Sequence, residues 1–302
     1  MNLQKVCEAL DGYFNIAAFG ESDWLELIPE SKRGSFQRFL RPDFMNGVWN
    51  GLMLENPGKA DEIDRVYLSV FPSQPILDTI IAREVERSAP GALIFTHHPL
   101  AYHERDAGFV TTPTAQLEEL HEHHISLYAC HAPLDCHVKT STGNALANAL
   151  GLQEQQRFAK YYAGMAGIHG IVPATTFEAF AEKLAQICEL DHLRYDQCRH
   201  NGQEVHHVAI VPGGGGDVEL IDEAAKLGAD TYVTGHWWLF GSSDYAKNDR
   251  EKMAGFVPTV NLNIVAASHY SSELIVMRDQ MVEWFRQLNV EAILMRQEDP
   301  WQ

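Results

Sequence analysis

From residue 60 onward, the chain alternates between short apolar segments and segments with helical spacing. The apolar segments are 64–71, 91–98 and 125–131, and the segments with helical spacing between them are 75–89 and 112–124. Uniformly apolar strands separated by helices are typical of a parallel sheet covered on both faces. The pattern therefore predicts an α/β fold. Ligand sites in such sheets lie beyond the carboxyl ends of the strands.

The second half of the chain continues the alternation. Further strands are predicted at 205–211, 230–236 and 260–269, and further helices at 143–152, 175–190, 217–228 and 271–288. Residues 153–170 are polar and contain glycine, so we expect them to form a passage into a second lobe. Residues 241–256 are predicted to form a polar loop.

The charge of the chain disfavours two classes of partner. Its 23 Lys and Arg residues against 41 Asp and Glu residues give a formal charge of −18 with histidine neutral. Nucleic-acid binding needs basic side chains that replace the counterions of the phosphates, and anionic membranes need them too. We therefore expect no nucleic-acid partner and no membrane partner. No apolar run approaches the roughly 18 residues that span a bilayer.

The first residues and the cysteines favour a cytoplasmic protein. Residues 1–14 are predicted to form an amphipathic helix with Leu3, Val6, Cys7, Leu10 and Phe14 on one side, unlike a signal peptide. The five cysteines form no CxxC pair and are odd in number, so we expect them to be reduced and buried.

Histidine is the residue type that stands out. Eight of the fifteen histidines lie between His97 and His137. Three clusters follow predicted strands: His97 with His98, His131 with Asp135, and His269 with Glu273; these are the candidate site residues. Imidazole and carboxylate suit Zn, Mn, Fe, Co or Ni. Four imidazoles and two carboxylates exceed one open tetrahedral zinc site, but they suit two metals with a bridging carboxylate.

Structural roles compete with this interpretation, because an isolated histidine is usually a hydrogen-bonded core or surface residue. His121, His123 and His124 lie on a Glu-rich predicted helix and are better explained as a solvated face. The four glycines at 213–216 predict a tight strand-to-helix turn, with an anion cradle as the alternative. Trp237 and Trp238 follow a predicted strand and would either join the core or line a pocket.

Taken together, four segments resemble a known family. The segments THHPL (96–100), HAPLD (131–135), TYVTGH (231–236) and SHYSSE (268–273) occur in the order seen in the dinuclear-metal-centre family of NIF-three-like proteins. Members are often labelled GTP cyclohydrolase I type 2 homologues. MNGVWNGLMLE (45–55) is similar to the family's Trp-Asp-Asn-x-Gly-Leu segment, and the final VEWFRQLNVEAILM is similar to its closing helix and strand, so the resemblance covers most of the chain.

The resemblance implies a set of metal ligands. His97 and His269 would bind one divalent ion, His98 and Asp135 would bind the other, and Glu273 would bridge the two. His131 matches a family histidine beside the metals, and it is our candidate for a catalytic proton-transfer role. The cofactors would be two divalent metal ions per chain, of the Zn, Fe, Mn, Co or Ni class.

The resemblance also implies an architecture. It predicts two interleaved α/β lobes with mostly parallel sheets flanked by helices, and a ring-shaped homohexamer. We expect a metal-binding lobe formed by 1–140 plus 257–302 and a second α/β lobe formed by 141–256. The sequence departs from the family at Trp49-Asn50-Gly51 and at the residues after Gly235, and residues 20–44 form a longer segment than usual.

These features lead to one main hypothesis and one alternative. The main hypothesis is a dinuclear metal-dependent hydrolase acting on a small molecule, such as a nucleotide or a cyclic amide. Two metals would lower the pKa of a bound water from 15.7 toward about 7, and His131 would pass protons. The alternative is a non-catalytic protein that binds metal for storage, delivery or regulation, or an adaptor. The same ligands would serve both.

Overall fold

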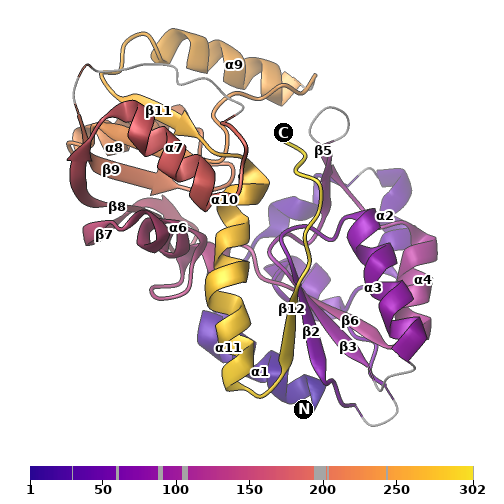
Figure 1. The fold of residues 1–302 in the computed structure, drawn as a ribbon. Helices are drawn as coiled ribbons and strands as arrows, with labels where there is room; N and C mark the ends of the chain where they lie inside the picture. Colours follow the sequence, from indigo (N-terminus) through magenta and orange to yellow (C-terminus); the bar gives the residue numbers. More distant parts are fainter. Residues whose placement is uncertain are drawn as a thin grey trace. The chain divides into compact units, whose positions relative to one another are not determined.

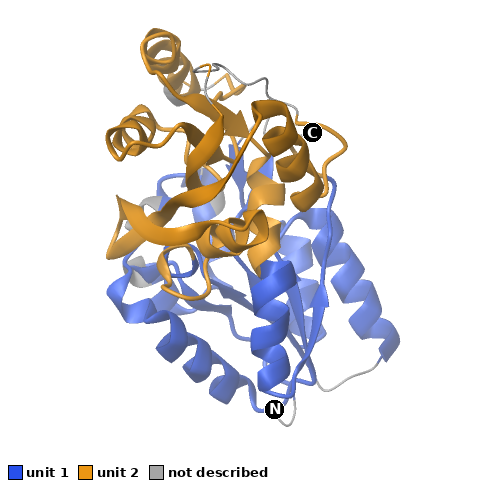
Figure 2. Cartoon of the chain, turned by 60° about the vertical axis from the view of Figure 1, so that its left-hand side comes forward, with its two compact units in different colours: residues 1–103, 107–134, 277–298 blue, residues 104–106, 135–276, 299–302 orange. Residues whose placement is uncertain are grey.

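The computed structural model of the chain describes residues 1–28, 30–58, 61–87, 91–103, 108–193, 202, 204–242 and 244–301. These residues form two compact units (Figure 2). Unit 1 comprises Met1–His103, Ala107–Leu134 and Met277–Glu298. Unit 2 comprises Asp135–Val276 and Asp299–Gln302, together with residues 104–106, which lie outside the described residues.

A five-stranded sheet forms the centre of unit 1, in the order β1-β6-β3-β2-β12. The strands are β1 (Gly51–Leu54), β2 (Arg65–Ser69), β3 (Ala92–Thr96), β6 (Ile125–Ala129) and β12 (Glu291–Leu294). Only β1 runs antiparallel to its neighbour. Strands β3 and β6 are buried at every position, as expected for a parallel sheet with both faces covered (Figure 1).

The two longest helices of unit 1 lie within segments that the sequence predicts to be helical, or begin next to them. Helix α1 (Leu3–Phe14) is capped by the Asn2 side chain, which accepts from the backbone N–H of Lys5, and it buries the apolar side predicted from the sequence. In helix α3 (Gln74–Arg87), the apolar Val85 is 47% exposed, whereas Glu84 is buried and accepts hydrogen bonds from Tyr67 and Arg87.

The remaining elements of unit 1 are short or lie near the ends of the chain. They are η1 (Ile16–Ala18), η2 (Ser22–Leu25), α2 (Glu30–Gln37), η3 (Phe44–Val48), β4 (Ala101–His103), β5 (Gly108–Val110), α4 (Thr114–Glu122), η4 (Met277–Met281) and α11 (Val282–Gln287). The predicted last helix, 271–288, is therefore interrupted by the π-helical turn η4.

Unit 2 is built on a second five-stranded sheet, in the order β11-β10-β9-β8-β7. Its strands are β7 (Gln153–Tyr161), β8 (Gly164–Thr175), β9 (Val205–Val211), β10 (Thr231–Thr234) and β11 (Asn263–Ala266). Strands β9, β10 and β11 are parallel, whereas β7 and β8 form an antiparallel hairpin. The helices are α6 (Thr142–Leu150), α7 (Phe177–Ile187), α8 (Val218–Lys226), α9 (Asp244–Phe256) and α10 (His269–Val276), and the short helix α5 (Ala132–Cys136) contains the change from unit 1 to unit 2.

Two expectations for unit 2 are wrong. Residues 153–170, expected to be a passage between lobes, form β7 and much of β8, because β7 is an edge strand with mostly exposed side chains and lacks an apolar pattern. Residues 241–256, expected to be a polar loop, contain helix α9, which buries only a few apolar residues such as Ala246 and Met253.

The boundaries of the compact units differ from the expected lobe boundaries. The expected changes lie at 140/141 and 256/257, whereas the units change at 134/135 and 276/277. Strand β11 belongs to unit 2 because it pairs in parallel with β10 over Thr231–Thr234. Among the described residues, no helix is long and apolar enough to cross a membrane.

Candidate metal centre

The histidines of unit 1 converge because two parallel strands end side by side. Strands β3 and β6 are paired in register up to Thr96 and Ala129. His97 and His98 directly follow β3, and His131 follows β6 by two residues. One ligand atom of each of these histidines lies within 4.8 Å of the others, so this group could hold a metal ion. The structure thus brings three of the predicted site residues together at the end of the sheet.

Backbone hydrogen bonds hold the two histidines after β3. The N–H of His97 donates to Ser69 O at 3.2 Å and that of His98 to Val70 O at 2.9 Å. The Thr96 hydroxyl donates to the carbonyls of Val70 and His98, both at 3.0 Å. The sheet pattern is thereby extended past the last residue of β3, which fixes the direction in which the imidazoles leave the backbone.

Aromatic side chains surround these imidazoles. The Phe71 ring stacks on His98 with centroids 4.3 Å apart. The Trp24 indole packs edge-on against His131 at 4.9 Å and against His98 at 6.0 Å. These aromatic side chains restrict the access of water to the imidazoles. Electrostatic interactions among the imidazoles are stronger as a result.

Glu21 contacts His131 and is not among the residues predicted from the sequence. Its buried carboxylate accepts four hydrogen bonds. Oε1 accepts from Asn50 Nδ2 at 2.6 Å and from the Ala132 N–H at 2.9 Å, and Oε2 accepts from Trp24 Nε1 at 2.8 Å and from His131 Nδ1 at 2.7 Å. Burial alone would raise the pKa of Glu21, but His131 and the other donors lower it below its ordinary value.

No sequence signal pointed to Glu21, because 110 positions separate it from His131. It lies in the longer N-terminal segment, 20–44, that has no clear periodic pattern. Asn50 belongs to the altered Trp49-Asn50-Gly51 segment, and its Oδ1 accepts from the His131 N–H at 2.7 Å. Two of the three places where the sequence departs from the family pattern therefore contact His131.

A second cluster lies within unit 2, where three parallel strands end together. Strands β9, β10 and β11 are aligned at Val211, Thr234 and Ala266. Gly213, His236 and His269 follow these ends. Glu273 lies one helical turn after His269 on α10, and its Oε1 is 3.0 Å from His269 Nε2. His236 Nε2 is 3.2 Å from His269 Nδ1.

Burial controls the protonation of one member of this second cluster, His236. His236 is buried, and desolvation, together with the charge of His269, lowers its pKa to about 3. Glu273 acts in the opposite direction but does not compensate. His236 is therefore a neutral imidazole at physiological pH.

The glycine turn at 213–216 packs directly on the second cluster. Gly213 has a φ of +63°, and a Cβ built on it would lie 2.0 Å from Glu273 Oε1 and 3.1 Å from His269 Nε2. Its N–H donates to Ser272 Oγ at 3.0 Å, and its carbonyl accepts from the N–H groups of Gly235 and His236. The predicted tight turn is confirmed, and its glycine allows the backbone to approach the acidic side chain.

The last residues of the chain hold His269 in place. Ser268 has a φ of 98°, which is unusual for a residue other than glycine. Its hydroxyl donates to Asp299 Oδ2 at 2.5 Å, and that of Ser271 donates to the same oxygen at 2.9 Å. The Trp301 ring lies 4.7 Å from the His269 ring and is stacked on His236 at 5.8 Å.

The structure also describes the contacts of the other residues singled out in the sequence. Asp135 lies on α5, and its Oδ1 accepts from the Thr142 hydroxyl at 2.7 Å. Trp237 and Trp238 are partly buried and pack against the hydrophobic core of unit 2, which favours the core interpretation. His121 on α4 is exposed and its Nδ1 is 2.9 Å from Asn56 Oδ1.

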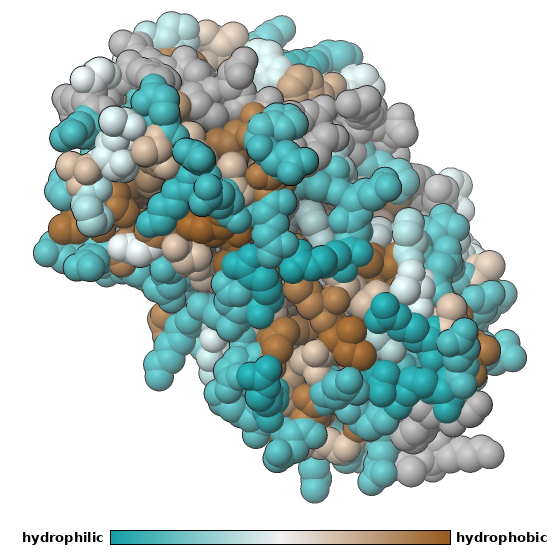
Figure 3. Space-filling view, viewed as in Figure 1, coloured by the Kyte–Doolittle hydropathy of each residue, from teal (hydrophilic) through white to brown (hydrophobic). Residues whose placement is uncertain are grey.

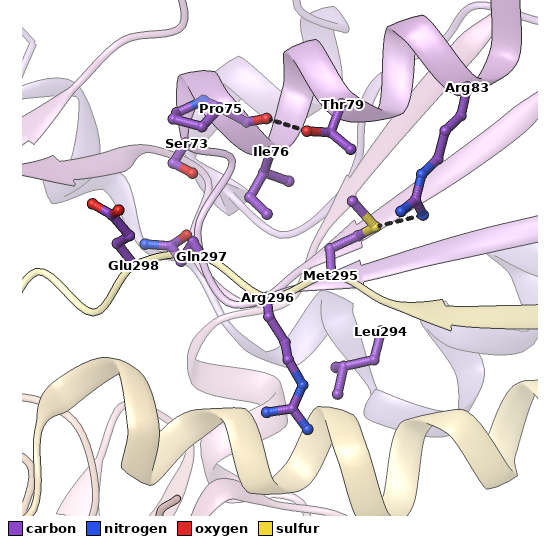
Figure 4. A pocket seen from close by; sticks show the side chains of 10 residues that line it. All are labelled: Ser73, Pro75, Ile76, Thr79, Arg83, Leu294, Met295, Arg296, Gln297 and Glu298. Carbon is purple, nitrogen blue, oxygen red and sulfur yellow. Dashed lines mark hydrogen bonds between the residues drawn. The ribbon is translucent and has the colours of Figure 1, made fainter. Parts of the chain in front are cut away.

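Unit 1 also has a pocket that none of the predicted site residues lines. It has a volume of about 690 Å³ and lies beyond the carboxyl ends of β2 and β12 (Figure 4). Apolar side chains such as Ile76 and Leu294 line it beside Arg83, whose Nη1 contacts Met295 Sδ at 3.5 Å. Figure 3 shows hydrophobic side chains gathered on one face of unit 1 and bordered by hydrophilic ones.

Comparison with known proteins identifies the family. Residues 37–300 match the model of the Duf34/NIF3 (NGG1p interacting factor 3) family. The chain belongs to this family. A curated relative from Deinococcus radiodurans, named GTP cyclohydrolase 1 type 2 homolog, is 26% identical over 268 residues, covering 84% of this chain and 83% of the relative. One of the same name from Pyrococcus horikoshii is 28% identical over 226 residues, covering 74% and 79%.

Solved structures show the same fold. A structure described as "protein ybgI, unknown function" matches with a TM-score of 0.67 and 20% identity, and covers 99% of this chain and 100% of its own. The Staphylococcus aureus hypothetical protein SA1388 matches with a TM-score of 0.66 and 17% identity, with 100% and 99% covered. The predicted NIF-three-like α/β fold is thereby confirmed.

Proposed function

We propose that this member of the Duf34/NIF3 family is a dinuclear metal-dependent hydrolase acting on a small molecule. The observation that carries the proposal is the convergence of His97, His98 and His131 at the ends of two parallel strands. The pairing of His269 with Glu273 adds a carboxylate next to an imidazole. This donor set fits Zn, Fe, Mn, Co or Ni, which accept nitrogen and oxygen ligands together.

The proposed ligand assignment follows the family motifs. His97 and His269 would hold one ion and His98 and Asp135 the other, with Glu273 as a ligand shared by both. When bound, paired divalent ions act as Lewis acids and make a coordinated water acidic. The protein side chains then have separate tasks: Gly213 leaves room for the Glu273 carboxylate, and His131 transfers a proton at its ring nitrogen.

The substrate class in this proposal is a small molecule with a hydrolysable bond, such as a nucleotide or a cyclic amide. The name of the curated relatives, GTP cyclohydrolase 1 type 2 homolog, places GTP among the first compounds to test. Phosphoesters and cyclic amides complete the screen, because hydroxide formed from a metal-bound water would be a nucleophile for phosphoryl and carbonyl centres alike.

The decisive experiment is metal content per chain by mass spectrometry, on protein purified without a histidine tag or chelator. We expect about two transition-metal ions per wild-type chain, as a two-metal site requires. A His98→Ala/Glu273→Gln double variant should lose them. A matched control, His121→Ala/Glu122→Gln on the exposed end of α4, should retain them.

Three results would separate the possible functions. Metal in the wild type with turnover of a screened compound supports the hydrolase. Metal without turnover of any compound favours the alternative, a protein that stores, delivers or senses metal. Fewer than about 0.2 ions per chain after reconstitution, a tenth of the two ions that a paired site takes, would contradict both.

The proposal includes an assembly and a location. By family resemblance, the active form is a homohexamer in the cytoplasm, with neither a nucleic-acid nor a membrane partner. The structure describes Cys7, Cys130, Cys136 and Cys188 as buried thiols, which suits a reducing compartment. Light scattering after gel filtration should give six times the 33.9 kDa chain mass; a monomer or dimer would exclude the hexamer.

A further inference from the structure

We infer that Glu21 is a positioning residue that fixes His131 in a single tautomer, with the proton on Nδ1 and the lone pair on Nε2. The inference rests on the proposed function in one respect only, namely that His131 is the group that transfers a proton. The hydrogen-bond network that fixes the tautomer is a property of unit 1 itself.

The first step is the protonation state of Glu21. Each of its two oxygens accepts two hydrogen bonds, and one of the four donors is the backbone N–H of Ala132, which can only donate. Trp24 Nε1 is also only a donor. Hydrogen bonds from four donors stabilise the charged form of a carboxyl group, and with His131 they lower the pKa of Glu21 below its ordinary value although the side chain is buried. Glu21 is therefore an ionised carboxylate.

The second step is the proton on His131. An ionised carboxylate is only an acceptor, so the 2.7 Å contact between Glu21 Oε2 and His131 Nδ1 requires a hydrogen on Nδ1. In the neutral form of the ring, this is its single N–H, and the lone pair is on Nε2. A carboxylate that bonds one ring nitrogen is a common way to set the role of the other.

The third step is the rigidity of the arrangement. The backbone N–H of His131 donates to Asn50 Oδ1 at 2.7 Å, and Asn50 Nδ2 donates to Glu21 Oε1 at 2.6 Å. The imidazole and its backbone are thus connected to the same two side chains. Trp24, which bonds Glu21, also packs against the His131 ring at 4.9 Å. The ring cannot rotate without breaking this network.

The tautomer can be measured directly in the metal-free protein. Selective ¹⁵N labelling of histidine, read in long-range proton–nitrogen spectra at pH 7.5, distinguishes the two neutral tautomers and the imidazolium. His131→Gln identifies the His131 signal by its loss. We expect wild-type His131 to show a protonated Nδ1 and an unprotonated Nε2.

The variant that tests the cause is Glu21→Met, which keeps the length of the side chain but removes both acceptors. We expect His131 to lose its fixed tautomer and to show exchange between both forms or a proton on Nε2. The matched control is Glu8→Met on the exposed side of α1, which should leave the His131 signal unchanged.

Several results would overturn the inference. They are a wild-type His131 that is protonated on Nε2, a wild-type imidazolium at pH 7.5, and a Glu21→Met variant with an unchanged His131 signal. If Glu21→Met does not fold, the wild-type spectrum alone decides. Because the spectra need neither metal nor substrate, a failure here is distinguishable from a failure of the proposed hydrolase, which metal content and turnover test.

Discussion

The close approach of Gly213 to Glu273 predicts the effect of a single methyl group. Gly213→Ala should displace the Glu273 carboxylate and destabilise the protein by about 1–3 kcal/mol, since a positive φ and a steric clash act together. Under the proposed function it should also weaken metal binding about tenfold or more. Urea unfolding and competition with a chromophoric chelator measure the two effects.

Gly151→Ala is the control for this variant. Gly151 also has a positive φ, +79°, but the nearest atom to its Cβ position is Lys183 Nζ at 3.9 Å, at the end of a flexible side chain. It should cost stability through backbone strain alone and leave metal affinity unchanged. Equal effects of both variants on metal affinity would refute the role assigned to Gly213.

The proximity of the three histidines in unit 1 could be predicted from the sequence, whereas the residues that contact them could not. His97, His98 and His131 each follow an apolar strand, and parallel strands end at one edge of a sheet. Glu21 could not be predicted, because a buried carboxylate has no sequence pattern when its partner is far along the chain. Trp301, which lies against the His269 ring in unit 2, could not be predicted for the same reason.

Cys7 provides a prediction about reactivity. Burial, supported by the nearby charge of Asp11, raises the pKa of the Cys7 thiol to about 12. Since the thiolate is the reactive form, Cys7 should resist iodoacetamide at pH 8 in the folded protein and react after unfolding in urea. Mass spectrometry of the peptide that contains Cys7 measures this. Rapid alkylation in native buffer would contradict the buried position on α1.

At the scale of elements, the strands and helices with an apolar face were predicted and those without one were not. Helix α6 ends at Leu150 with Gly151 as its C-cap, and α7 begins after Thr176, whose hydroxyl accepts from the Ala179 N–H; glycine and threonine are typical at these positions. By contrast, β7 is an exposed edge strand and α9 buries few apolar side chains, so neither shows a clear period in the sequence. Their structure depends on pairing and packing with elements distant along the chain.

Arg157 on β7 connects this edge strand to the loop after α5. Its guanidinium donates to the carbonyls of Cys136, His137 and Met165. Arg157→Met should destabilise the protein by about 2–3 kcal/mol, because carbonyl groups lose donors that are charged. Chemical denaturation measures the loss. Lys160→Met, an exposed position on the same strand, should change stability by less than about 0.5 kcal/mol.

The contact between β8 and β9 predicts a dependence on pH. His169 Nδ1 is 3.0 Å from His207 Nε2, and burial together with the charge of His207 lowers the pKa of His169. The folded-state pKa therefore lies below the unfolded value of about 6.5. Between these two values the unfolded chain binds more protons, so the free energy of unfolding decreases as the pH falls through this range.

His169→Gln isolates this contribution, because the glutamine amide can still donate to His207 but does not titrate. Urea unfolding at pH 7.5 and at pH 5.5 should show a smaller loss of stability in the variant than in the wild type. An identical loss in both proteins would assign the acid sensitivity to other groups, such as His236, whose pKa is lowered to about 3.

At the scale of the whole molecule, the family and the fold could be predicted, whereas the compact units could not be delimited. The motifs at 96–100, 131–135 and 268–273 identify a family that the match over residues 37–300 confirms. The boundary at 134/135 lies between His131 and Asp135, within one of these motifs. A prediction that assigns each motif to a single lobe therefore places this boundary elsewhere.

Under the proposed function, metal binding should stabilise the folded chain against unfolding. If the folded form binds ions that the unfolded form does not, zinc at 100 times its dissociation constant should add about 2.7 kcal/mol per site to the free energy of unfolding. Thermal unfolding of chelator-treated protein, with and without added zinc, measures this. The His98→Ala/Glu273→Gln variant should show no shift. A shift of equal size in that variant would indicate adventitious binding.

Glu21 has a consequence for comparisons across the family. The match to the family model begins at residue 37, so the carboxylate that bonds His131 lies outside the residues that this model covers. Substitutions at Glu21, Asn50 and the loop after β6 should covary during evolution, because the donors and acceptors must stay matched. A truncated form that starts at residue 37 would retain every proposed metal ligand and yet lack the acceptor for His131.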